Sequence, residues 1–329
     1  MKTKKSAIFI LFGIALLALC LLSMRFGSVS LDTKSFFSAL LRREGYSAQS
    51  AIIYTLRLPR TLAGILAGVG LGLSGVLLQS VTDNKMASPG LIGVNSGAGF
   101  AVILALSLPF FPIKLIPLAA FGGAFLATLA IIAIAGRMGM TKNTVVLSGI
   151  AFSAILSAGI SLFSLLDADV LVNYNAFSVG SLAGSRADEL ILPAILIMLA
   201  LGAAIFAAKK INILALGAPI ATSLGVRVKA LRVFCMLLAS AAAGAAVSAV
   251  GLLGFVGLMS PHIARALVGA DARRLIPCTA LVGADLLLAA DLCGRVIFAP
   301  GEMPVGVLMA LLGAPFFLTI LLKGGRRDA

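Results

Sequence analysis

Seven long uncharged runs constrain this chain more than any other feature of its sequence. Each has about 20 residues or more, the length at which an apolar helix crosses a lipid bilayer, and none contains Lys, Arg, Asp or Glu. The runs are Ser6–Met24, Thr61–Thr82, Leu115–Gly136, Asn143–Leu166, Leu190–Ala208, Val233–Ala264 and Met303–Leu322. Only 12% of the residues are charged, whereas a soluble domain carries roughly 25%. The sequence therefore predicts an all-α protein that crosses a membrane many times.

The apolar pattern predicts about ten membrane-spanning helices in one transmembrane domain that covers residues 1–329. The predicted helices are Ser6–Phe26, Thr61–Ser80, Pro89–Leu108, Ile113–Arg137, Thr144–Leu166, Leu190–Ala208, Ala230–Val250, Gly254–Val268, Leu275–Phe298 and Pro304–Leu322. No charged residue separates the seventh helix from the eighth. The basic start, MKTKK, resembles that of a signal peptide, but the apolar run after it is long for one, so we expect a retained first helix.

The basic residues indicate how these helices are oriented. Ten spans place both chain ends on one side of the membrane. With the ends in the cytoplasm, 17 of the 26 Lys and Arg residues lie inside and nine outside, in agreement with the positive-inside rule. The net charge of +14 therefore belongs to the loops. We expect no nucleic-acid partner, because a nucleic-acid-binding domain gathers its basic residues on one face.

Three connecting segments are too long for simple turns. The outer segment 27–58 is charged and has room for a short amphipathic helix. The outer segment 167–189 contains "NAFSVGSLAGSRADE", whose glycines and serines predict a broken or re-entrant helix; such backbone is tolerated only inside protein or beside a water-filled cavity. The cytoplasmic segment 209–232 alternates short apolar turns with basic residues, which predicts one or two short surface helices.

A weak internal echo suggests an inverted repeat. "MASPGLIG" precedes the third predicted helix and "LMSPHIAR" lies at the eighth, and we expect Ser-Pro to begin a helix in both, where a proline costs little. The two motifs are five helices apart. An odd offset inverts one half relative to the other, a common arrangement in transporters, here with helices 2–5 matching helices 7–10.

The sequence lacks the motifs of an enzyme. It contains no GxxxxGK[ST] P-loop, no HExxH and no evident Ser-His-Asp set, so any ATP must be hydrolysed by another chain. The cysteines are scattered in apolar surroundings without CxxC spacing, and we expect neither a zinc site nor a disulfide framework. We therefore expect no metal site and no cofactor in this chain.

Charged residues inside a span are costly, about 2.5–3.5 kcal/mol each on insertion scales, and the ninth predicted helix carries three of them. Asp291 and Arg295 are four residues apart, so they share a helix face and can pair. Asp291 then has either a structural or a substrate-binding role. Asp285 has no evident partner on its own helix.

The second predicted helix carries arginines and glycines at characteristic positions. The stretch "YTLRLPRTL" places Arg57 and Arg60 at its outer mouth, with the proline between them starting the helix. Exposed arginines there are either solvated, bound to lipid phosphates, or available to grip the carboxylates of a partner. Gly64, Gly68 and Gly72 recur every four residues and form a small-residue face that permits close helix contact.

Four longer stretches resemble one transporter family. They are "RLPRTLAGILAGVGLGLSGVLLQ", "SPGLIGVNSGAGF", "GLLGFVGLMSPHIAR" and "GEMPVGVLMALLGAPFFLTILLK", and they resemble the permease subunits of ABC importers for iron chelates, haem and cobalamin. The resemblance covers nearly the whole chain in order. It implies ten helices per subunit in the bacterial cytoplasmic membrane. It also implies a second permease subunit (identical or different), two cytoplasmic ATPases that carry ATP and Mg, and an external substrate-binding protein.

The same resemblance implies roles for particular residues. Outer arginines of the family grip glutamates on the binding protein, and Arg57, Arg60 and Arg295 stand at those positions. The family's ATPase-coupling helix falls in segment 209–232, where Ala218 replaces the usual glutamate. The implied coupling residues are Leu216, Gly217, Ala218, Ala221, Thr222, Leu224 and Gly225.

The resemblance also implies a gate and a pathway. Asn84 and Lys85 replace the family's Asn-Pro near the inner gate, and Phe177, before Gly180 and Ser181, replaces a tryptophan at the pore mouth. Helices 5 and 10 and segment 167–189 are expected to line the path. His262, the single histidine, lies in a motif shared across unlike cargoes, so we expect it to have a structural role at a helix start.

We therefore interpret the sequence as the permease subunit of an ABC importer that moves a bulky metal chelate inward by alternating access. Ferric siderophore is the first candidate cargo, then haem, then cobalamin. The alternative is an ion-coupled secondary transporter that uses Asp285 or Asp291 as its carboxylate.

Overall fold

The computed structural model describes residues 2–27, 32–41 and 47–324, and every regular element in these ranges is a helix. The long helices are α1 (Lys2–Arg25), α4 (Leu58–Thr82), α6 (Ile116–Arg137), α7 (Lys142–Leu166), α9 (Ile191–Leu214), α11 (Val228–Val250) and α13 (Ala272–Ile297). Shorter helices are α5 (Val94–Leu106), α8 (Ala168–Val179), α12 (Val256–Val268) and α14 (Val305–Gly324). The prediction of an all-α polytopic membrane protein is confirmed.

All ten predicted helices coincide with observed helices, but the number of membrane crossings stays a prediction. Within the described ranges, seven helices are long and apolar enough to cross a bilayer. Helices α5 and α12, with 13 residues each, are shorter than the roughly 20 residues that a full span needs. They can cross only together with the non-helical segments that adjoin them.

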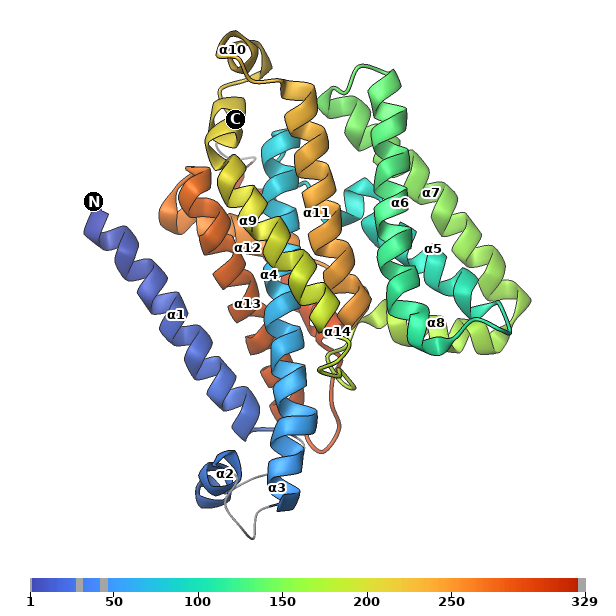
Figure 1. Ribbon diagram of the computed structural model, residues 1–329, viewed down its shortest axis with the longest axis vertical. Helices are drawn as coiled ribbons and strands as arrows, with labels where there is room; N and C mark the ends of the chain where they lie inside the picture. Colours follow the sequence, from blue (N-terminus) through green and yellow to red (C-terminus); the bar gives the residue numbers. More distant parts are fainter. Residues whose placement is uncertain (1, 28–31, 42–46, 325–329) are drawn as a thin grey trace.

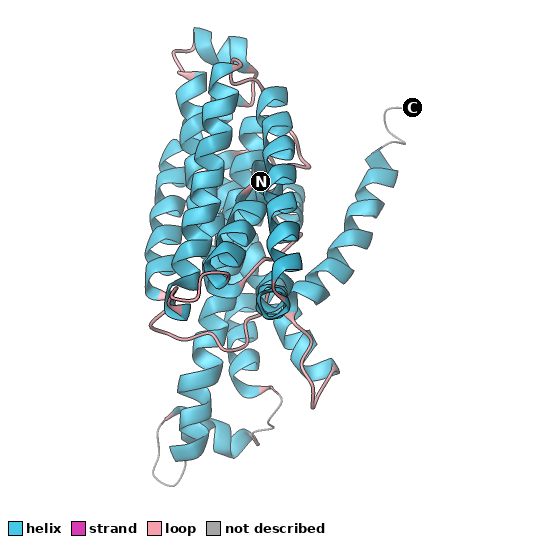
Figure 2. Cartoon of the chain, turned by 90° about the vertical axis from the view of Figure 1, so that its right-hand side faces the viewer, coloured by secondary structure: helices cyan, strands magenta, loops and turns pink. Residues whose placement is uncertain are grey.

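Helix α4 is the centre of the bundle. It packs against α13, α11, α12 and α9 (Figure 1). Helices α5, α6, α7 and α8 form a second group on the right of the view, which joins the centre through contacts between α6 and α11. Figure 2 shows α14 projecting from the bundle. The centre is thus closely packed, while α14 lies at its margin.

Glycines bring α4 and its neighbours into backbone contact. A Cβ added to Gly68 would overlap the carbonyl of Gly283 on α13, and one added to Gly75 would overlap the carbonyl of Gly257 on α12. Gly64 faces Leu288, and an added Cβ would lie 2.8 Å from that side chain. The predicted small-residue face on this helix therefore packs as expected, since only small residues let two helix backbones approach so closely.

Helix α4 does not begin at Thr61 as predicted. Helix α3 (Ser47–Ala51), the π-helix η1 (Ile52–Arg57) and α4 follow one another directly, and the apolar helix runs unbroken from Ala48 to Thr82. The proline expected to start the helix, Pro59, is therefore inside it. Proline has no N–H to donate, and the wider π turn just before it accommodates the missing bond.

The outer segment contains the short amphipathic helix that its charge pattern suggested. Helix α2 (Thr33–Leu40) buries Phe36 and Ala39 against Ile53 of η1, while Phe37 on the opposite face is 55% exposed. The parts of segment 27–58 between these helices lie outside the described residues. Helices α2 and α3 extend below the bundle in Figure 1, and we refer to this side as the α2 end.

The opposite side carries α10 (Ala218–Ser223), the projecting helix at the top of Figure 1, and we refer to it as the α10 end. Helix α1 begins, and helix α14 ends, in the half of the molecule toward α10. The two ends of the described chain therefore point the same way. The assignment of that side to the cytoplasm stays a prediction.

The Ser-Pro echo is only half correct. Pro89 begins the short 3-10 helix η2 (Pro89–Ile92), as predicted. Pro261 instead lies inside α12, which begins at Val256, five residues earlier. The proposed relation between helices 2–5 and 7–10 therefore loses this element of its support.

Candidate functional site

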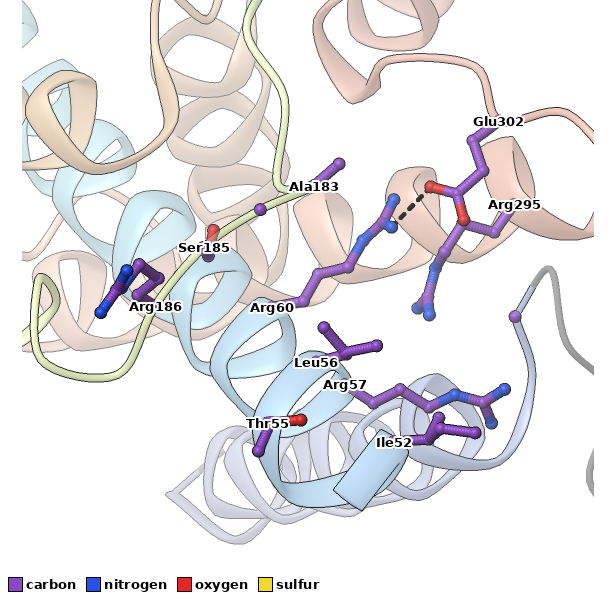
Figure 3. Close-up of a pocket in the computed structure, with 12 residues that line it drawn as sticks. Ile52, Thr55, Leu56, Arg57, Arg60, Ala183, Ser185, Arg186, Arg295 and Glu302 are labelled. Atoms are coloured by element: carbon purple, nitrogen blue, oxygen red, sulfur yellow. Dashed lines mark hydrogen bonds and ion pairs between the residues drawn. The ribbon is translucent and has the colours of Figure 1, made fainter. Parts of the chain in front are cut away.

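A pocket of about 360 Å³ opens at the α2 end between several parts of the chain that are distant in sequence (Figure 3). The η1–α4 helix contributes Arg57 and Arg60, α13 contributes Arg295, and the loop after α8 contributes Arg186. Thr55, Ser185 and Glu302 add polar groups to its wall. The pocket therefore gathers the three arginines that the sequence placed at the outer mouth.

A buried carboxylate holds two of these arginines together. The Arg60 guanidinium donates to Asp291 at 2.8 Å, and Arg295 Nε lies 3.0 Å from the other oxygen of Asp291. The Asp291 and Arg295 side chains are only 1% and 2% exposed. Arg60 also pairs with Glu302 at 2.6 Å, at the rim of the pocket. The predicted Asp291–Arg295 pair is confirmed. Sequence reasoning named Arg60 but missed its pairs with Asp291 and Glu302, because these residues are distant from it in the chain.

Arg57 and Arg295 bind the C-terminal end of α1. Arg57 Nη1 donates to the carbonyls of Met24, at 3.0 Å, and of Arg25. Arg295 donates to the carbonyl and hydroxyl oxygens of Ser23, the latter at 2.7 Å, and to the carbonyl of Phe26. The last carbonyls of a helix have no partner within it and attract cations. These arginines therefore fix α1 to α4 and α13.

The exposure expected of the docking arginines is not observed. Arg57 and Arg295 are 6% and 1% exposed, and the Arg60 side chain is 12% exposed. They are buried because each satisfies oxygen acceptors within the chain. Arg186, which the sequence analysis did not single out, is the exposed basic group of the pocket, at 66%. Whether the three arginines bind an external protein stays a prediction.

The outer segment 167–189 contains a helix followed by irregular backbone, as its composition suggested. Helix α8 ends at Val179, and the chain around Gly180 pairs with the end of α11, the residues that follow it and the start of α14. The Ser181 N–H donates to Val250 O at 2.9 Å, and the Gly180 carbonyl accepts from Gly306 N at 3.2 Å. The Phe177 carbonyl accepts from Leu252 N at 3.1 Å, and its ring packs on the core. Such pairing is what irregular backbone at membrane depth requires.

The residues expected at the gate lie in the turn after α4. The Asn84 side chain accepts from Met86 N at 2.9 Å, which stabilises the turn, and Lys85 is exposed. The neighbouring Asp83 forms an ion pair with Lys142 at the start of α7. Both pair members are exposed, so the pair adds little stability.

Helix α10 projects between α9 and α11 at the α10 end (Figure 1). Gly217 and Gly225 bound it with φ of 103° and 81°, a backbone region open to glycine at little cost. Ile220 within α10 is 50% exposed, and Leu216 and Leu224 on either side of the helix are each 58% exposed, so α10 and its flanking turns expose three large apolar side chains.

The remaining predicted coupling residues differ in position. Ala221 is fully buried on the inner side of α10 and anchors it to the bundle. Ala218 and Thr222 are joined by a hydrogen bond from the Thr222 hydroxyl to the Ala218 carbonyl at 2.9 Å. Sequence reasoning missed Ile220, although its spacing from Leu216 and Leu224 is visible in the chain.

His262 is not at a helix start, contrary to expectation. It lies in the middle of α12, and its ring meets the Phe316 ring of α14 edge to face with centroids 5.8 Å apart. The described residues contain no group of three or more His, Cys, Asp or Glu side chains that could hold a metal ion. The contact with Phe316 is consistent with a structural role for His262, which stays a prediction.

Asp285 is the unusual carboxylate of α13. It is 8% exposed, and neither of its oxygens has a hydrogen-bond partner among the described residues. Asp291, by contrast, is held by two arginines.

The helical fold is that of a polytopic membrane protein. Residues 15–323 match the model of the FecCD transport family, and the chain belongs to that family. It is therefore a permease of the ABC importer class, a transmembrane component without an enzymatic role of its own.

Individual relatives support this assignment. The chain is 40% identical to the ferric enterobactin transport system permease protein FepD of Escherichia coli (strain K12), over 86% of this chain and 85% of that one. It is 36% identical to the hemin transport system permease protein HmuU of Yersinia pestis, over 94% and 93%. An inward-facing structure of a transporter assigned to the metal-chelate ABC type superposes with a TM-score of 0.85 at 29% identity, over 97% of this chain and 99% of that one.

Proposed function

We propose that this chain is the permease subunit of an ATP-driven importer that moves a bulky metal chelate into the cytoplasm by alternating access. The observation that carries the proposal is α10, a projecting helix at which three large apolar side chains, Leu216, Ile220 and Leu224, are exposed. A contiguous apolar patch exposed to water is typical of a surface that binds another protein or a membrane. A transporter with no P-loop of its own needs an ATPase partner at such a site.

This function implies a set of partners and an orientation. The α10 end faces the cytoplasm, where two ATPase subunits, which carry ATP and Mg, bind the pair of permease subunits. A second permease subunit, identical or different, completes the pathway. The α2 end faces outward and receives a substrate-binding protein, and both chain ends are cytoplasmic.

The binding protein is proposed to dock over the pocket at the α2 end. The Arg186 side chain is exposed there. Arg60 is paired with Glu302, whose side chain is 30% exposed, so a partner's carboxylate can approach Arg60 by displacing Glu302. Carboxylates of the partner would pair with these guanidinium groups, which match them bidentately. Arg57 and Arg295 support the site by holding α1 in place.

Ferric siderophore is the leading cargo, followed by haem and then cobalamin. The named relatives transport ferric enterobactin and hemin. We propose that α7, α14 and segment 167–189 line the path. Gate residues Asn84 and Lys85 lie toward the α10 end of that path, and Phe177, Gly180 and Ser181 toward the other.

Growth and uptake by a deletion strain test the cargo. The strain is supplied with single iron sources, namely several ferric siderophores and haem, or with limiting cobalamin. Loss of growth on one iron chelate, restored by the intact gene and not by a copy lacking residues 216–225, identifies the cargo and supports the importer. Unimpaired growth on all of them would contradict this order of cargoes.

A second candidate function is an ion-coupled secondary transporter, and Asp285 is the observation that favours it. Its buried carboxyl has no hydrogen-bond partner among the residues that the structure describes, and ionisable residues within spans often mark ion pathways. An Asp285→Asn variant that retains uptake would exclude this mechanism.

A further inference from the structure

Helix α10 is connected to the rest of the molecule chiefly through the helices on either side of it. It packs on the end of α9 and the start of α11, and its backbone continues into both through short turns. Any displacement of α10 therefore passes first to α9 and α11. The contacts that α9 and α11 make at the α10 end determine which helices the displacement reaches next.

Helix α11 is clamped to the turn between α6 and α7 by Arg232. This side chain, in the second turn of α11, is 8% exposed, and its Nη1 donates to the Met140 carbonyl at 2.7 Å. Met140 is the residue that joins the two helices: its φ is +53°, and its own N–H donates to Ala135 O at 2.8 Å. A guanidinium on a carbonyl just after a helix C-terminus is favoured electrostatically.

Helix α9 is clamped to the turn between α12 and α13 by Asn212. Its Nδ2 donates to Asp271 at 2.7 Å, and its Oδ1 accepts from Ala272 N at 2.7 Å. Asp271 caps α13 by accepting from Arg273 N. Donation from Asn212 lowers the pKa of Asp271 below its ordinary value, so the carboxylate remains an ionised acceptor to lower pH than a free aspartate would.

We infer that Arg232 and Asn212 are positioning residues that carry the displacement of α10 along two separate routes. Arg232 passes it to α6 and α7, and Asn212 passes it to α13. This inference rests on the proposed role of α10 as the ATPase-binding helix. Each clamp joins a helix flanking α10 to a turn more than fifty residues away in the sequence. The Arg232 clamp is buried, and the Asn212 clamp combines an exposed bond to Asp271 with a part-buried bond from Ala272 N.

Hydrogen–deuterium exchange on the intact complex tests this inference. The permease, assembled with its ATPase in nanodiscs, is compared without nucleotide and with MgATP plus vanadate. We expect nucleotide to change the exchange of residues 215–226 and, with it, that of the two turns, residues 138–145 and 269–276. A response at 215–226 with none at either turn would overturn the inference while leaving the proposed function intact.

Two variants separate the routes. Arg232→Met keeps the side-chain length and removes the hydrogen-bond donors. It should reduce the nucleotide-dependent change in exchange at residues 138–145 about fivefold or more, the lower limit of typical couplings between sites. Residues 269–276 should still respond. Asn212→Ala should do the opposite. A purely structural role would not produce this selectivity. Arg232→Lys, which retains a donor, should restore most of the response.

The chain offers a matched control for Arg232. Arg137 lies in the last turn of α6, beside the same turn, and is exposed, so Arg137→Met should leave both responses unchanged. Equal loss at both turns in either variant, or no loss in both, would refute the two-route inference. If Arg232→Met fails to assemble, the inference is judged by whether both turns respond to nucleotide in the wild-type complex. If residues 215–226 do not respond at all, the proposed ATPase-binding role of α10 fails, and the inference fails with it.

Discussion

Charged side chains in the membrane region of this protein are nearly all neutralised by one another or by helix ends. Asp291 lies between Arg60 and Arg295, while Arg57 and Arg295 also bind carbonyls at the end of α1. Removing one member of a buried ionic group leaves the others uncompensated, which costs more than the pair itself contributes. The arginines at the α2 end therefore have a structural role whatever they bind outside the molecule.

At this scale we predict that Asp291→Asn destabilises the protein by about 3–5 kcal/mol, the usual cost of breaking a buried ion pair. The variant leaves two buried guanidinium groups without their shared anion. Thermal unfolding in detergent measures the effect. Glu302→Gln is the control, because its pair with Arg60 lies at the rim, and its midpoint should stay close to wild type. Equal midpoints for the two variants would contradict the structural role of Asp291.

Glu302 pairs with Arg60, the arginine that a carboxylate of an acidic partner would bind. This leads to a second prediction. Glu302→Gln removes a competing carboxylate from Arg60, so the affinity for the substrate-binding protein should rise about threefold, the order expected of one rim charge pair. Biolayer interferometry with the permease in nanodiscs measures it. Arg186→Glu should lower the same affinity. A decrease with Glu302→Gln would show that Glu302 itself contacts the partner.

The pairing of residues was predictable only where the partners share a helix. Asp291 and Arg295 are four residues apart, and the helical repeat alone indicates their pairing. The contacts of Arg60 with Asp291 and of Arg295 with Ser23 span 231 and 272 residues. They depend on how three helices pack, which no local pattern reveals. The expectation of exposed arginines was wrong for this reason.

Among the elements, α4 shows how glycine spacing becomes helix packing. We predict that Gly68→Ala, whose methyl group would overlap the backbone of α13, costs about 1–3 kcal/mol, as overpacking typically does. Gly122→Ala on α6 is the control, since nothing lies within 4 Å of its added Cβ, and it should be neutral or slightly stabilising. Thermal unfolding of both variants in the same detergent checks this, and an unaffected Gly68→Ala variant would contradict the close contact.

The apolar side chains exposed at α10 lead to a further prediction. Ile220→Ser combined with Leu224→Ser should weaken ATPase association at least about tenfold, because a few apolar side chains carry most of the energy of such interfaces. Affinity measured with the purified ATPase tests it. Leu165→Ser, at the far end of α7 and 85% exposed, is the matched control. Retained affinity in the double variant would place the ATPase contact elsewhere.

The elements themselves were largely predictable, because a membrane helix is a long apolar run. The errors occurred where the helical hydrogen bonding is irregular. The π turn before Pro59 extends a helix past a residue expected to start it, and α12 begins five residues before Pro261. Proline is a reliable marker of a helix start only when no wider turn or preceding segment accommodates it.

For the whole molecule, the energy source distinguishes the two candidate functions. We predict that a protonophore leaves uptake of the iron chelate intact while cellular ATP is maintained, because an ABC importer is driven by hydrolysis. Orthovanadate in inverted or reconstituted vesicles should abolish it. Uptake that collapses with the proton gradient at constant ATP would instead favour a transporter that uses Asp285.

The contact between Gly68 and Gly283 has a consequence for how the molecule can deform. Two helices whose backbones touch have no layer of side chains between them that could let one slide over the other. We therefore expect α4 and α13 to move as one rigid body. At 1.5 Å per residue the 26-residue α13 is about 39 Å long. Asp271 lies at the first end of α13, and Asp291 with its arginines lies near the other. A small tilt of this helix pair at one membrane surface therefore moves its other end at the opposite surface, without any rearrangement of side chains in between.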